Sequence, residues 1–229
     1  MLPVKAILVD FDGTACTADV SEALLEAFGE PEWIGVNDAI ERGEIGLRDG
    51  ARRQAEMLGA PLYGMIEFAI GNCPLDPTFP AFVDWTRDHG LPLQIVSDGF
   101  GFYVRPILEA AGLAGLDVRT NELDGAKRFS YPNAHPECVG CGNCKMLAAE
   151  RTRELYGPIA FVGEGMSDRY GALYSDLVFA KKELPPICDA DGVPYLPWET
   201  FDDVRQALEG MEGVPGPVAP PRCPGWRTE

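Results

Sequence analysis

The stretch Val4-Lys5-Ala6-Ile7-Leu8-Val9-Asp10-Phe11-Asp12-Gly13-Thr14 decides the fold, because an apolar run ends there at two acidic residues. A run of this length that contains valine and isoleucine is typical of a buried parallel strand. Ligands of open α/β sheets bind beyond the carboxyl ends of the strands, so Asp10 and Asp12 are predicted to lie at a binding site. Residues two apart leave an extended chain on the same side, and both carboxylates can therefore meet one substrate or one hard cation.

A calcium loop, a helix cap and a surface turn each account for this acidic pair less well. An EF-hand loop also begins with two acids two residues apart, but it needs glycine at its sixth position and glutamate at its twelfth, where this chain has Ala15 and Ser21. Helix capping near Thr17 would use one carboxylate and leave the other without a role. A surface turn is the remaining alternative, and the motifs further along the chain argue against it.

The charge of the chain limits its partners. Asp and Glu total 36 residues against 19 Lys and Arg, which gives a formal net charge of −17 over 229 residues. Such a charge repels nucleic acid and anionic lipid, and it disfavours an anionic substrate unless a bound cation or local basic groups reverse the field at the site. No apolar run near the N-terminus is long enough for a membrane span or a secretory signal, so we expect a cytoplasmic protein with no membrane partner. The composition does not indicate the oligomeric state.

The seven cysteines are an odd number in a chain for which no secretory signal is predicted, which favours free thiols or a metal site over a disulfide framework. Four candidate zinc ligands lie close together in the sequence: His135, Cys138, Cys141 and Cys144. Thiolates and imidazole suit Zn²⁺, although this spacing crowds all four ligands into one loop. The alternative is a cluster of reduced, partly buried thiols that packs the loop.

The rest of the sequence alternates between strands and helices. Strands are predicted at 93–99, 116–121, 158–163 and 176–180, helices at 79–88, 102–111 and 144–155, and an irregular stretch at 123–143. This alternation indicates right-handed βαβ units, and therefore a three-layer α/β fold with a Rossmann-like parallel sheet.

Residues 15–80 have helical spacing with no strand, which predicts a small helical cap inserted after the first strand. The catalytic core would then comprise 1–14 and 81–209. The Pro/Gly-rich tail 210–229 is expected to be poorly ordered, with Trp226 as a residue that could dock.

Four motifs follow one another, each in the right strand or helix context: Asp-Phe-Asp-Gly-Thr at 10–14, Ser97-Asp98-Gly99, the lone Lys145 at a helix start, and Gly163-Glu164-Gly165-Met166-Ser167-Asp168. This set resembles the haloacid dehalogenase superfamily of phosphatases, and the helical segment is similar to the cap of its phosphoserine-phosphatase-like branch. The resemblance implies a Mg²⁺-dependent phosphomonoesterase that acts on a small phosphorylated metabolite through an aspartyl-phosphate.

The resemblance also implies a role for each motif residue. Asp10 would be the nucleophile, and Asp12 the general acid and base. The Mg²⁺ ligands would come from Asp10, Asp12, Glu164 and Asp168, and the phosphate would be held by Thr14, Ser97, Asp98, Gly99 and Lys145.

Glu164 departs from the family pattern, which has aspartate at this position. The added methylene forces the carboxylate to fold back or the metal to shift, and Mg²⁺ tolerates poor octahedral geometry badly. Two alternatives to the main hypothesis therefore stay open: a phosphatase for another small metabolite such as phosphoserine, and a catalytically impaired relative that binds a phosphorylated ligand.

Two further patterns carry less weight. Gly163-x-Gly165 suggests a dinucleotide site, but the third glycine of that fingerprint is replaced by Asp168, whose carboxylate would repel a pyrophosphate. Lys181 and Lys182 are most simply a solvated face.

Overall fold

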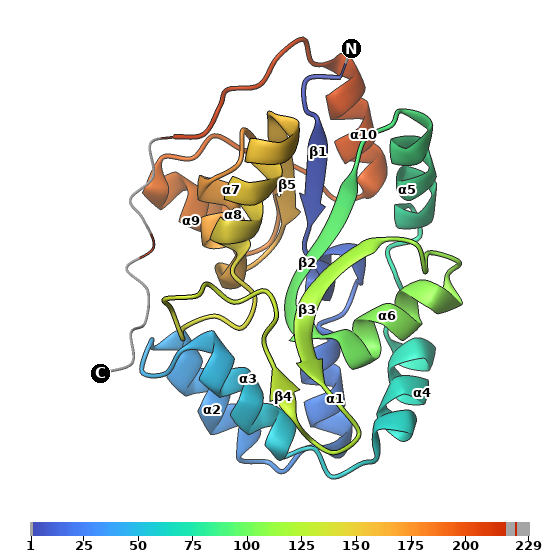
Figure 1. Ribbon diagram of the computed structural model, residues 1–229, viewed down its shortest axis with the longest axis vertical. Coiled ribbons are helices and arrows are strands. Elements are labelled where there is room, and N and C mark those ends of the chain that lie inside the picture. The colour runs from blue at the N-terminus through green and yellow to red at the C-terminus, as the bar shows by residue number, and fades with distance from the viewer. Residues whose placement is uncertain (1, 219–222, 224–229) are drawn as a thin grey trace.

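The computed structural model describes residues 2–218 and 223, and within them seven strands form one sheet in the order β4-β3-β2-β1-β5-β6-β7 (Figure 1). The first strand, β1 (Ala6–Val9), lies in the middle and runs parallel to β2 (Leu93–Phe100) and β5 (Ile159–Gly163). The outer strands are β3 (Asp117–Leu123) and β4 (Phe129–Ser130) on one side, and β6 (Leu177–Ala180) and β7 (Leu196–Pro197) on the other. Of these, β4 pairs with β3 in the antiparallel direction, whereas β7 runs parallel to β6.

Helices cover both faces of the sheet, which confirms the predicted three-layer α/β fold. One face packs against α5 (Phe79–Asp88), α6 (Gly101–Ala110) and α10 (Phe201–Gly210). The other face packs against α7 (Lys145–Tyr156), α8 (Arg169–Leu173) and α9 (Leu184–Asp191).

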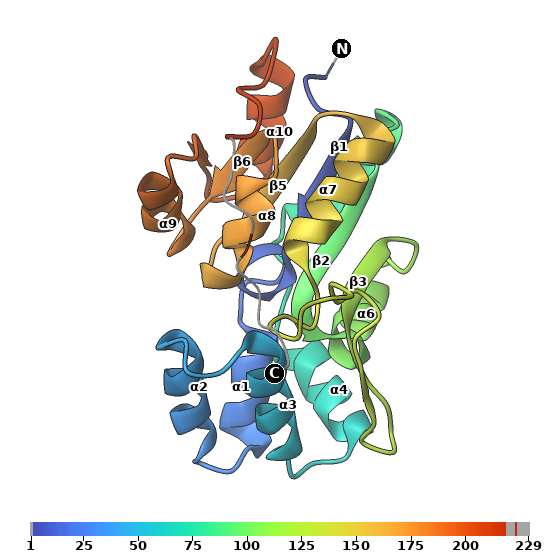
Figure 2. The ribbon, with the colours of Figure 1, turned by 60° about the vertical axis from the view of Figure 1, so that its left-hand side comes forward.

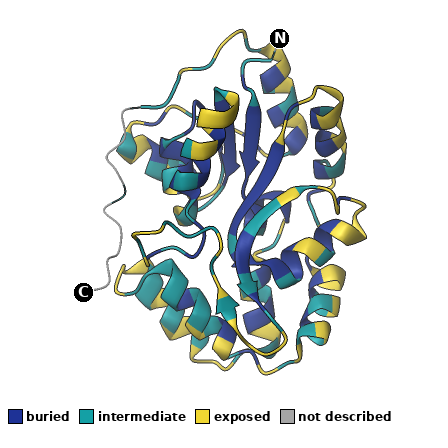
Figure 3. Ribbon diagram, viewed as in Figure 1, coloured by how far each residue is buried: buried dark blue, intermediate teal, exposed yellow. Residues whose placement is uncertain are grey.

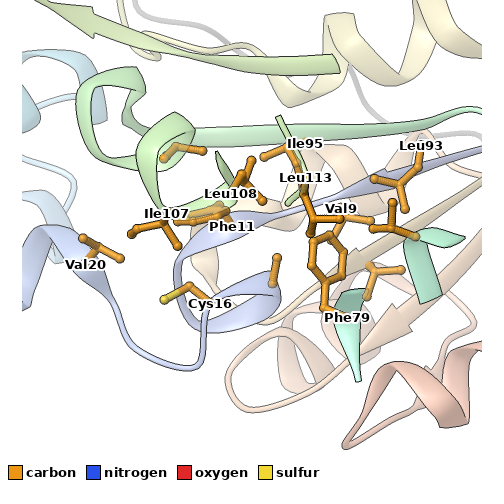
Figure 4. Packing of buried hydrophobic residues seen from close by; sticks show 14 of the residues in the cluster. Val9, Phe11, Cys16, Val20, Phe79, Leu93, Ile95, Ile107, Leu108 and Leu113 are labelled. Atoms are coloured by element: carbon orange, nitrogen blue, oxygen red, sulfur yellow. The ribbon is translucent and has the colours of Figure 1, made fainter. Parts of the chain in front are cut away.

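The apolar run that begins the chain is buried on both sides, as a central parallel strand should be (Figure 3). Ile7 and Val9 point into one core cluster, and Ala6 and Leu8 into the other. The first cluster continues beyond the strand through Phe11, which belongs to the same core as Phe79 of α5 and Ile107 of α6 (Figure 4). This packing fixes the main chain on either side of Asp10.

Four helices separate β1 from β2 along the chain: α1 (Val20–Phe28), α2 (Trp33–Glu41), α3 (Leu47–Glu56) and α4 (Leu62–Asn72). Both ribbon views place them together beyond the carboxyl ends of the strands (Figures 1 and 2). We call these residues, 20–72, the helical insertion. The predicted division of the chain into core, cap and tail stays a prediction.

The two connections to the helical insertion lie side by side. Cys16 and Leu75 form an isolated antiparallel bridge. Thr17 N donates to Pro74 O at 3.0 Å, and Asp76 N donates to Ala15 O at 2.9 Å. The prediction of a purely helical segment is therefore confirmed for its helices but misses this short pairing.

Some elements differ from the sequence predictions. The segment from 123 to 143 was predicted to be irregular, yet it contains β4, and neither β7 nor the short helix α8 was predicted. The second strand, predicted at 93–99, continues to Phe100, with an irregularity in its pairing after Val96. In the tail, Trp226 lies outside the described residues. No helix within the described residues is long and apolar enough to cross a membrane.

Candidate active site

A tight turn carries the chain away from the end of β1 and sets the position of Asp10. The turn, η1 (Phe11–Ala15), is closed by Ala15 N and Cys16 N, which donate to Asp10 O and Phe11 O. Gly13 has φ 70°, and a Cβ there would lie 2.7 Å from Glu164 Cδ, so a glycine is needed both for the turn and for the approach of Glu164. Asp10 is 5% exposed, and its N–H donates to Val162 O of β5 at 3.0 Å.

Lys145, the first residue of α7, joins three of the predicted carboxylates. Its Nζ lies 2.7 Å from Asp10 Oδ1, 2.7 Å from Asp168 Oδ1 and 3.6 Å from Asp98 Oδ2. The lysine side chain is 2% exposed, so these charges interact with little water between them. Burial alone would lower the pKa of Lys145, but the three carboxylates together hold it well above its ordinary value.

Three carboxylates, those of Asp10, Asp98 and Asp168, surround the single ammonium group of Lys145. Burial and, after it, the charge of Asp168 raise the pKa of Asp10 from 3.8 to about 7, against the opposing effect of Lys145. Burial likewise raises the pKa of Asp98, against the effect of Lys145. The site therefore favours any added positive charge.

Asp168 holds Lys145 in place rather than standing free to bind a metal. One carboxylate oxygen, Oδ1, accepts from Lys145, while Oδ2 accepts from Glu164 N at 2.8 Å and from Gly165 N at 3.1 Å. Asp168 is 1% exposed. Asp168 therefore orients Lys145 in this structure, and that it also supplies a Mg²⁺ ligand stays a prediction.

Asp12 is held by groups from three elements. Its Oδ1 accepts from Val20 N of α1 at 2.9 Å, and its Oδ2 accepts from Ser97 Oγ of β2 and from Tyr103 Oη of α6, each at 3.2 Å. Tyr103 Oη lies 2.8 Å from Ser21 Oγ, so a hydrogen-bond chain runs from the helical insertion to Asp12. Burial, followed by the charges of Asp19 and Asp10, raises the pKa of Asp12 well above its ordinary value.

The groups predicted to hold phosphate are not all free to do so. Gly99 N donates to Ser97 Oγ at 2.9 Å instead of pointing to a vacant position. Thr14 is fully buried, and its hydroxyl has no hydrogen-bond partner. Ser97 and Asp98 do lie at the site, through the contacts to Asp12 and Lys145 given above.

Two contributors to the site were not found from the sequence. Tyr103 is one of them, and its place on the first turns of α6 directly after the Ser97-Asp98-Gly99 motif is the signal that could have identified it. Asn143 is the other: its Nδ2 donates to Ser97 O and to Arg119 O, both at 2.8 Å, and so ties the loop before Lys145 to β2 and β3.

Glu164 pairs with a lysine that was predicted to be a solvated face. Lys182 Nζ lies 2.7 Å from Glu164 Oε2 and donates to Gly13 O at 3.3 Å. Lys181 also has a specific contact, because its ammonium lies 3.7 Å from the centre of the Trp198 ring. Both lysines therefore make specific contacts, while the Lys182 side chain is also exposed, as a solvated face predicts.

In the described part of the chain, no three His, Cys, Asp or Glu side chains are arranged to hold a metal ion. At the end of β1, Lys145 pairs with Asp10 and Asp168, and Lys182 pairs with Glu164. The predicted zinc site is corrected by the same finding. Its side chains instead serve local turns: Cys138 Sγ accepts from Gly140 N, Cys144 Sγ caps α7 by accepting from Leu147 N, and His135 Nδ1 accepts from Glu137 N.

The thiols form a packed cluster, which was the alternative to a zinc site. Burial raises the pKa of the Cys141 and Cys144 thiols above their ordinary value, and neighbouring thiols add to the rise. Cys223 from the tail is among these neighbours, which the sequence did not predict. Cys141, Cys144 and Cys223 are thiols that are not joined in disulfides.

A small cavity of about 30 Å³ lies between the helical insertion and α6. Its lining is mostly apolar and includes no charged side chain: Ser21, Leu24, Leu25, Ala51, Gln54, Ala55, Leu58, Phe100, Phe102 and Tyr103. Tyr103 belongs both to this lining and to the hydrogen-bond chain of Asp12. The cavity therefore begins where the candidate acid and base is held.

The site contains the buried carboxylate of Asp10 at the end of the central strand, the buried Lys145 paired with it, and the carboxylate of Asp12 nearby. A comparison of the whole sequence agrees with this arrangement. The model of the haloacid dehalogenase-like hydrolase family matches residues 7–172, and the chain belongs to this family. Its relatives and structural neighbours are phosphatases, so the protein is a hydrolase that acts on phosphate monoesters.

Among its relatives is a 2-hydroxy-3-keto-5-methylthiopentenyl-1-phosphate phosphatase from Geobacillus kaustophilus, which is 33% identical over 215 residues, or 91% of this chain and 97% of the relative. A protein of the same name from an Exiguobacterium species is 29% identical over 211 residues, covering 90% of this chain and 97% of its own. A structure of phosphoserine phosphatase as a phospho-aspartyl intermediate analogue superposes with a TM-score of 0.65 at 20% identity, over 91% of this chain and 99% of that one. At this identity the superposition shows the shared fold.

Proposed function

We propose that this protein is a Mg²⁺-dependent phosphomonoesterase that forms an aspartyl-phosphate on Asp10. The observation that supports this most directly is the pair formed by Asp10 and Lys145, two buried charges 2.7 Å apart at the carboxyl end of β1. A buried ion pair is costly to build for stability alone, which favours a chemical role.

The chain's own residues account for both halves of the reaction. An oxygen of the Asp10 carboxylate attacks phosphorus, the bond from phosphorus to the leaving oxygen breaks, and Asp12 gives that oxygen its proton. A water molecule then attacks the phosphoryl group, Asp12 takes back a proton from the water, and the bond between Asp10 and phosphorus breaks. Lys145 orients Asp10 throughout and balances the negative charge near the phosphoryl oxygens.

The donor chemistry of this site fits Mg²⁺, because carboxylate oxygens are the ligands that this cation prefers. The groups described above comprise five carboxylates (Asp10, Asp12, Asp98, Glu164 and Asp168) against two ammonium groups (Lys145 and Lys182). We propose the Asp10 carboxylate, the main-chain carbonyl of Asp12 and the Glu164 carboxylate as the groups that would hold it, and Asp168 as the partner of Lys145. When bound, the cation would reduce the repulsion between Asp10 and the phosphate dianion.

We propose 2-hydroxy-3-keto-5-methylthiopentenyl-1-phosphate as the substrate. Several relatives carry this name, among them the two described above. The stretches 31–33, 96–103, 141–145 and 195–198 carry the predicted resemblance to this phosphatase. The cavity beside Tyr103 has the apolar lining that a methylthio group needs, and its volume of about 30 Å³ would have to widen to admit one. Phosphoserine, the alternative, carries an ammonium and a carboxylate that would meet no charged side chain in that cavity.

The test compares phosphate release from the two substrates and from an aryl phosphate, with added Mg²⁺ and with a chelator. Asp10→Asn should abolish turnover and leave the fold intact, whereas the exposed control Asp88→Asn should keep wild-type rates. Faster release from phosphoserine would favour the alternative substrate. Absence of turnover on all three compounds with Mg²⁺ would favour the catalytically impaired relative, and turnover by Asp10→Asn would remove Asp10 as the nucleophile.

A further inference from the structure

The carboxylate of Glu164 is shared between two parts of the site. It lies against the turn after β1, since a Cβ on Gly13 would come within 2.8 Å of both of its oxygens. It also pairs with Lys182, whose ammonium reaches the Gly13 carbonyl of the same turn. The lysine therefore sits between the ends of β1 and β5, where a cation bound by Asp10, Asp12 and Glu164 would have to approach.

The main chain holds Lys182 there at a conformational cost. Its φ is 51°, a left-handed value that residues with a Cβ adopt rarely. The loop that carries it is fixed by two hydrogen bonds to one carbonyl, because Glu183 N and Leu184 N donate to Glu164 O at 2.9 and 2.8 Å. Glycine or asparagine would adopt this φ more easily. That a lysine stands here despite the cost indicates that its side chain has a role at this position.

The two lysines of the site differ in their freedom to move. Lys145 is 2% exposed and is enclosed by three carboxylates. The Lys182 side chain is 51% exposed and that of Glu164 is 22% exposed, so the Lys182 ammonium can turn into water when another cation takes its place. The extra methylene of Glu164, compared with aspartate, gives its carboxylate the reach to face either cation.

We propose that Lys182 is a built-in counter-cation that competes with Mg²⁺ for Glu164 and so weakens the affinity of the site for the metal. This inference rests on the proposed metal dependence. A second positive charge near Mg²⁺ is repulsive, but half of the lysine side chain is in water and the repulsion is screened. We therefore expect its removal to tighten Mg²⁺ binding by about three- to tenfold.

The experiment measures Mg²⁺ affinity directly, by isothermal titration calorimetry of the full chain without substrate. Lys182→Met removes the charge, and Lys182→Gly removes it while also relieving the positive φ, so at least one of these variants should fold. Lys182→Arg keeps the charge. Lys127→Met is the matched control, because Lys127 is an exposed lysine that also has a positive φ, 55°, and lies away from Glu164 in the loop before β4.

Tighter Mg²⁺ binding by Lys182→Met and Lys182→Gly, with Lys182→Arg and Lys127→Met within about twofold of wild type, would support the proposal. Unchanged or weaker binding by the two neutral variants would overturn it. The titration involves no turnover. If the variants hydrolyse the substrate normally and bind Mg²⁺ with unchanged affinity, the inference about Lys182 is refuted and the proposed function is not. Absence of Mg²⁺ binding in every variant would refute both the inference and the metal dependence.

Discussion

Replacing Lys145 by methionine should be among the most damaging single changes in this protein. Methionine keeps most of the aliphatic stem but removes the ammonium, which leaves Asp10 and Asp168 without the partner that lies 2.7 Å from each, and Asp98 without the one at 3.6 Å. Removing one partner of a buried ion pair costs about 3–5 kcal/mol, because the remaining charge is buried without compensation. That is a large share of the roughly 5–15 kcal/mol by which a typical domain is stable.

The loss should depend on pH in a defined direction. The pKa of Asp10 is raised from 3.8 to about 7, so between these values the folded protein holds a proton that the unfolded chain has released. Stability therefore rises as the pH falls through this window, and it is lowest above pH 7. Lys145 lowers the pKa of Asp10, so its removal raises that pKa further and the variant loses most at high pH.

Urea unfolding followed by tryptophan fluorescence, at about pH 8 and about pH 5.5, measures both effects. Lys145→Met should lose about 3–5 kcal/mol at the higher pH and clearly less at the lower one, and adding Asp168→Asn should restore part of the loss. Lys5→Met is the control, because the Lys5 ammonium makes a single hydrogen bond among the described residues, to Leu2 O at 3.5 Å, and this variant should stay within about 0.5 kcal/mol of wild type. A loss below about 1 kcal/mol, or one equal at both pH values, would refute the electrostatic argument.

Three further predictions concern the groups around Asp12 and the proposed metal ligand Glu164. Tyr103→Phe and Ser21→Ala each interrupt the hydrogen-bond chain to Asp12, and each should lower kcat about tenfold with KM within about twofold. The double variant should be no worse than Tyr103→Phe alone, and additive losses in steady-state kinetics would show that the two hydroxyls act separately. Gly99→Ala should lower kcat about a hundredfold, because the new Cβ would collide with Tyr103 Oη and lie 2.7 Å from Asp12 Oδ2. The same overpacking should lower the stability by about 1–3 kcal/mol, and wild-type kinetics would contradict this prediction. Glu164→Gln should raise the Mg²⁺ concentration needed for half-maximal activity and Glu164→Asp should not; identical Mg²⁺ curves for both variants and wild type would show that Glu164 is not a ligand.

Much of the fold could be predicted from local sequence, because the central strands are nearly continuous apolar runs with glycine or proline beside them. The edge strands β4 and β7 could not, since each is two residues long and is held by pairing with a neighbour rather than by its own pattern. The strand β2 was predicted to end at Gly99 and extends one residue further, because Phe100 pairs with Asn121 of β3 beyond an irregularity that the local pattern does not reveal. The cytoplasmic location stays a prediction.

The candidate site divides in the same way. The motifs identified Asp10, Asp12, Lys145 and Glu164 because these residues follow or begin regular elements in a recognisable order. The partners of these residues depend on distances across the sheet, and Tyr103 with Ser21 is a contact over 82 residues of sequence. Lys182 follows β6 by two residues, so the strand-end rule that identified Asp10 would have found it as well.

The paired connections at Cys16 and Leu75 have a consequence for how such a protein can diverge. Because Asp76 N donates to Ala15 O, the chain enters and leaves the helical insertion at nearly the same point. The core is therefore connected to the whole insertion in the same way as it would be to one short turn. The entropy of closing a loop grows slowly with its length, so lengthening, shortening or exchanging this piece should cost the core little. Selection could then replace the surface that meets the organic part of a substrate as a unit, while Asp10 and Lys145 keep their positions.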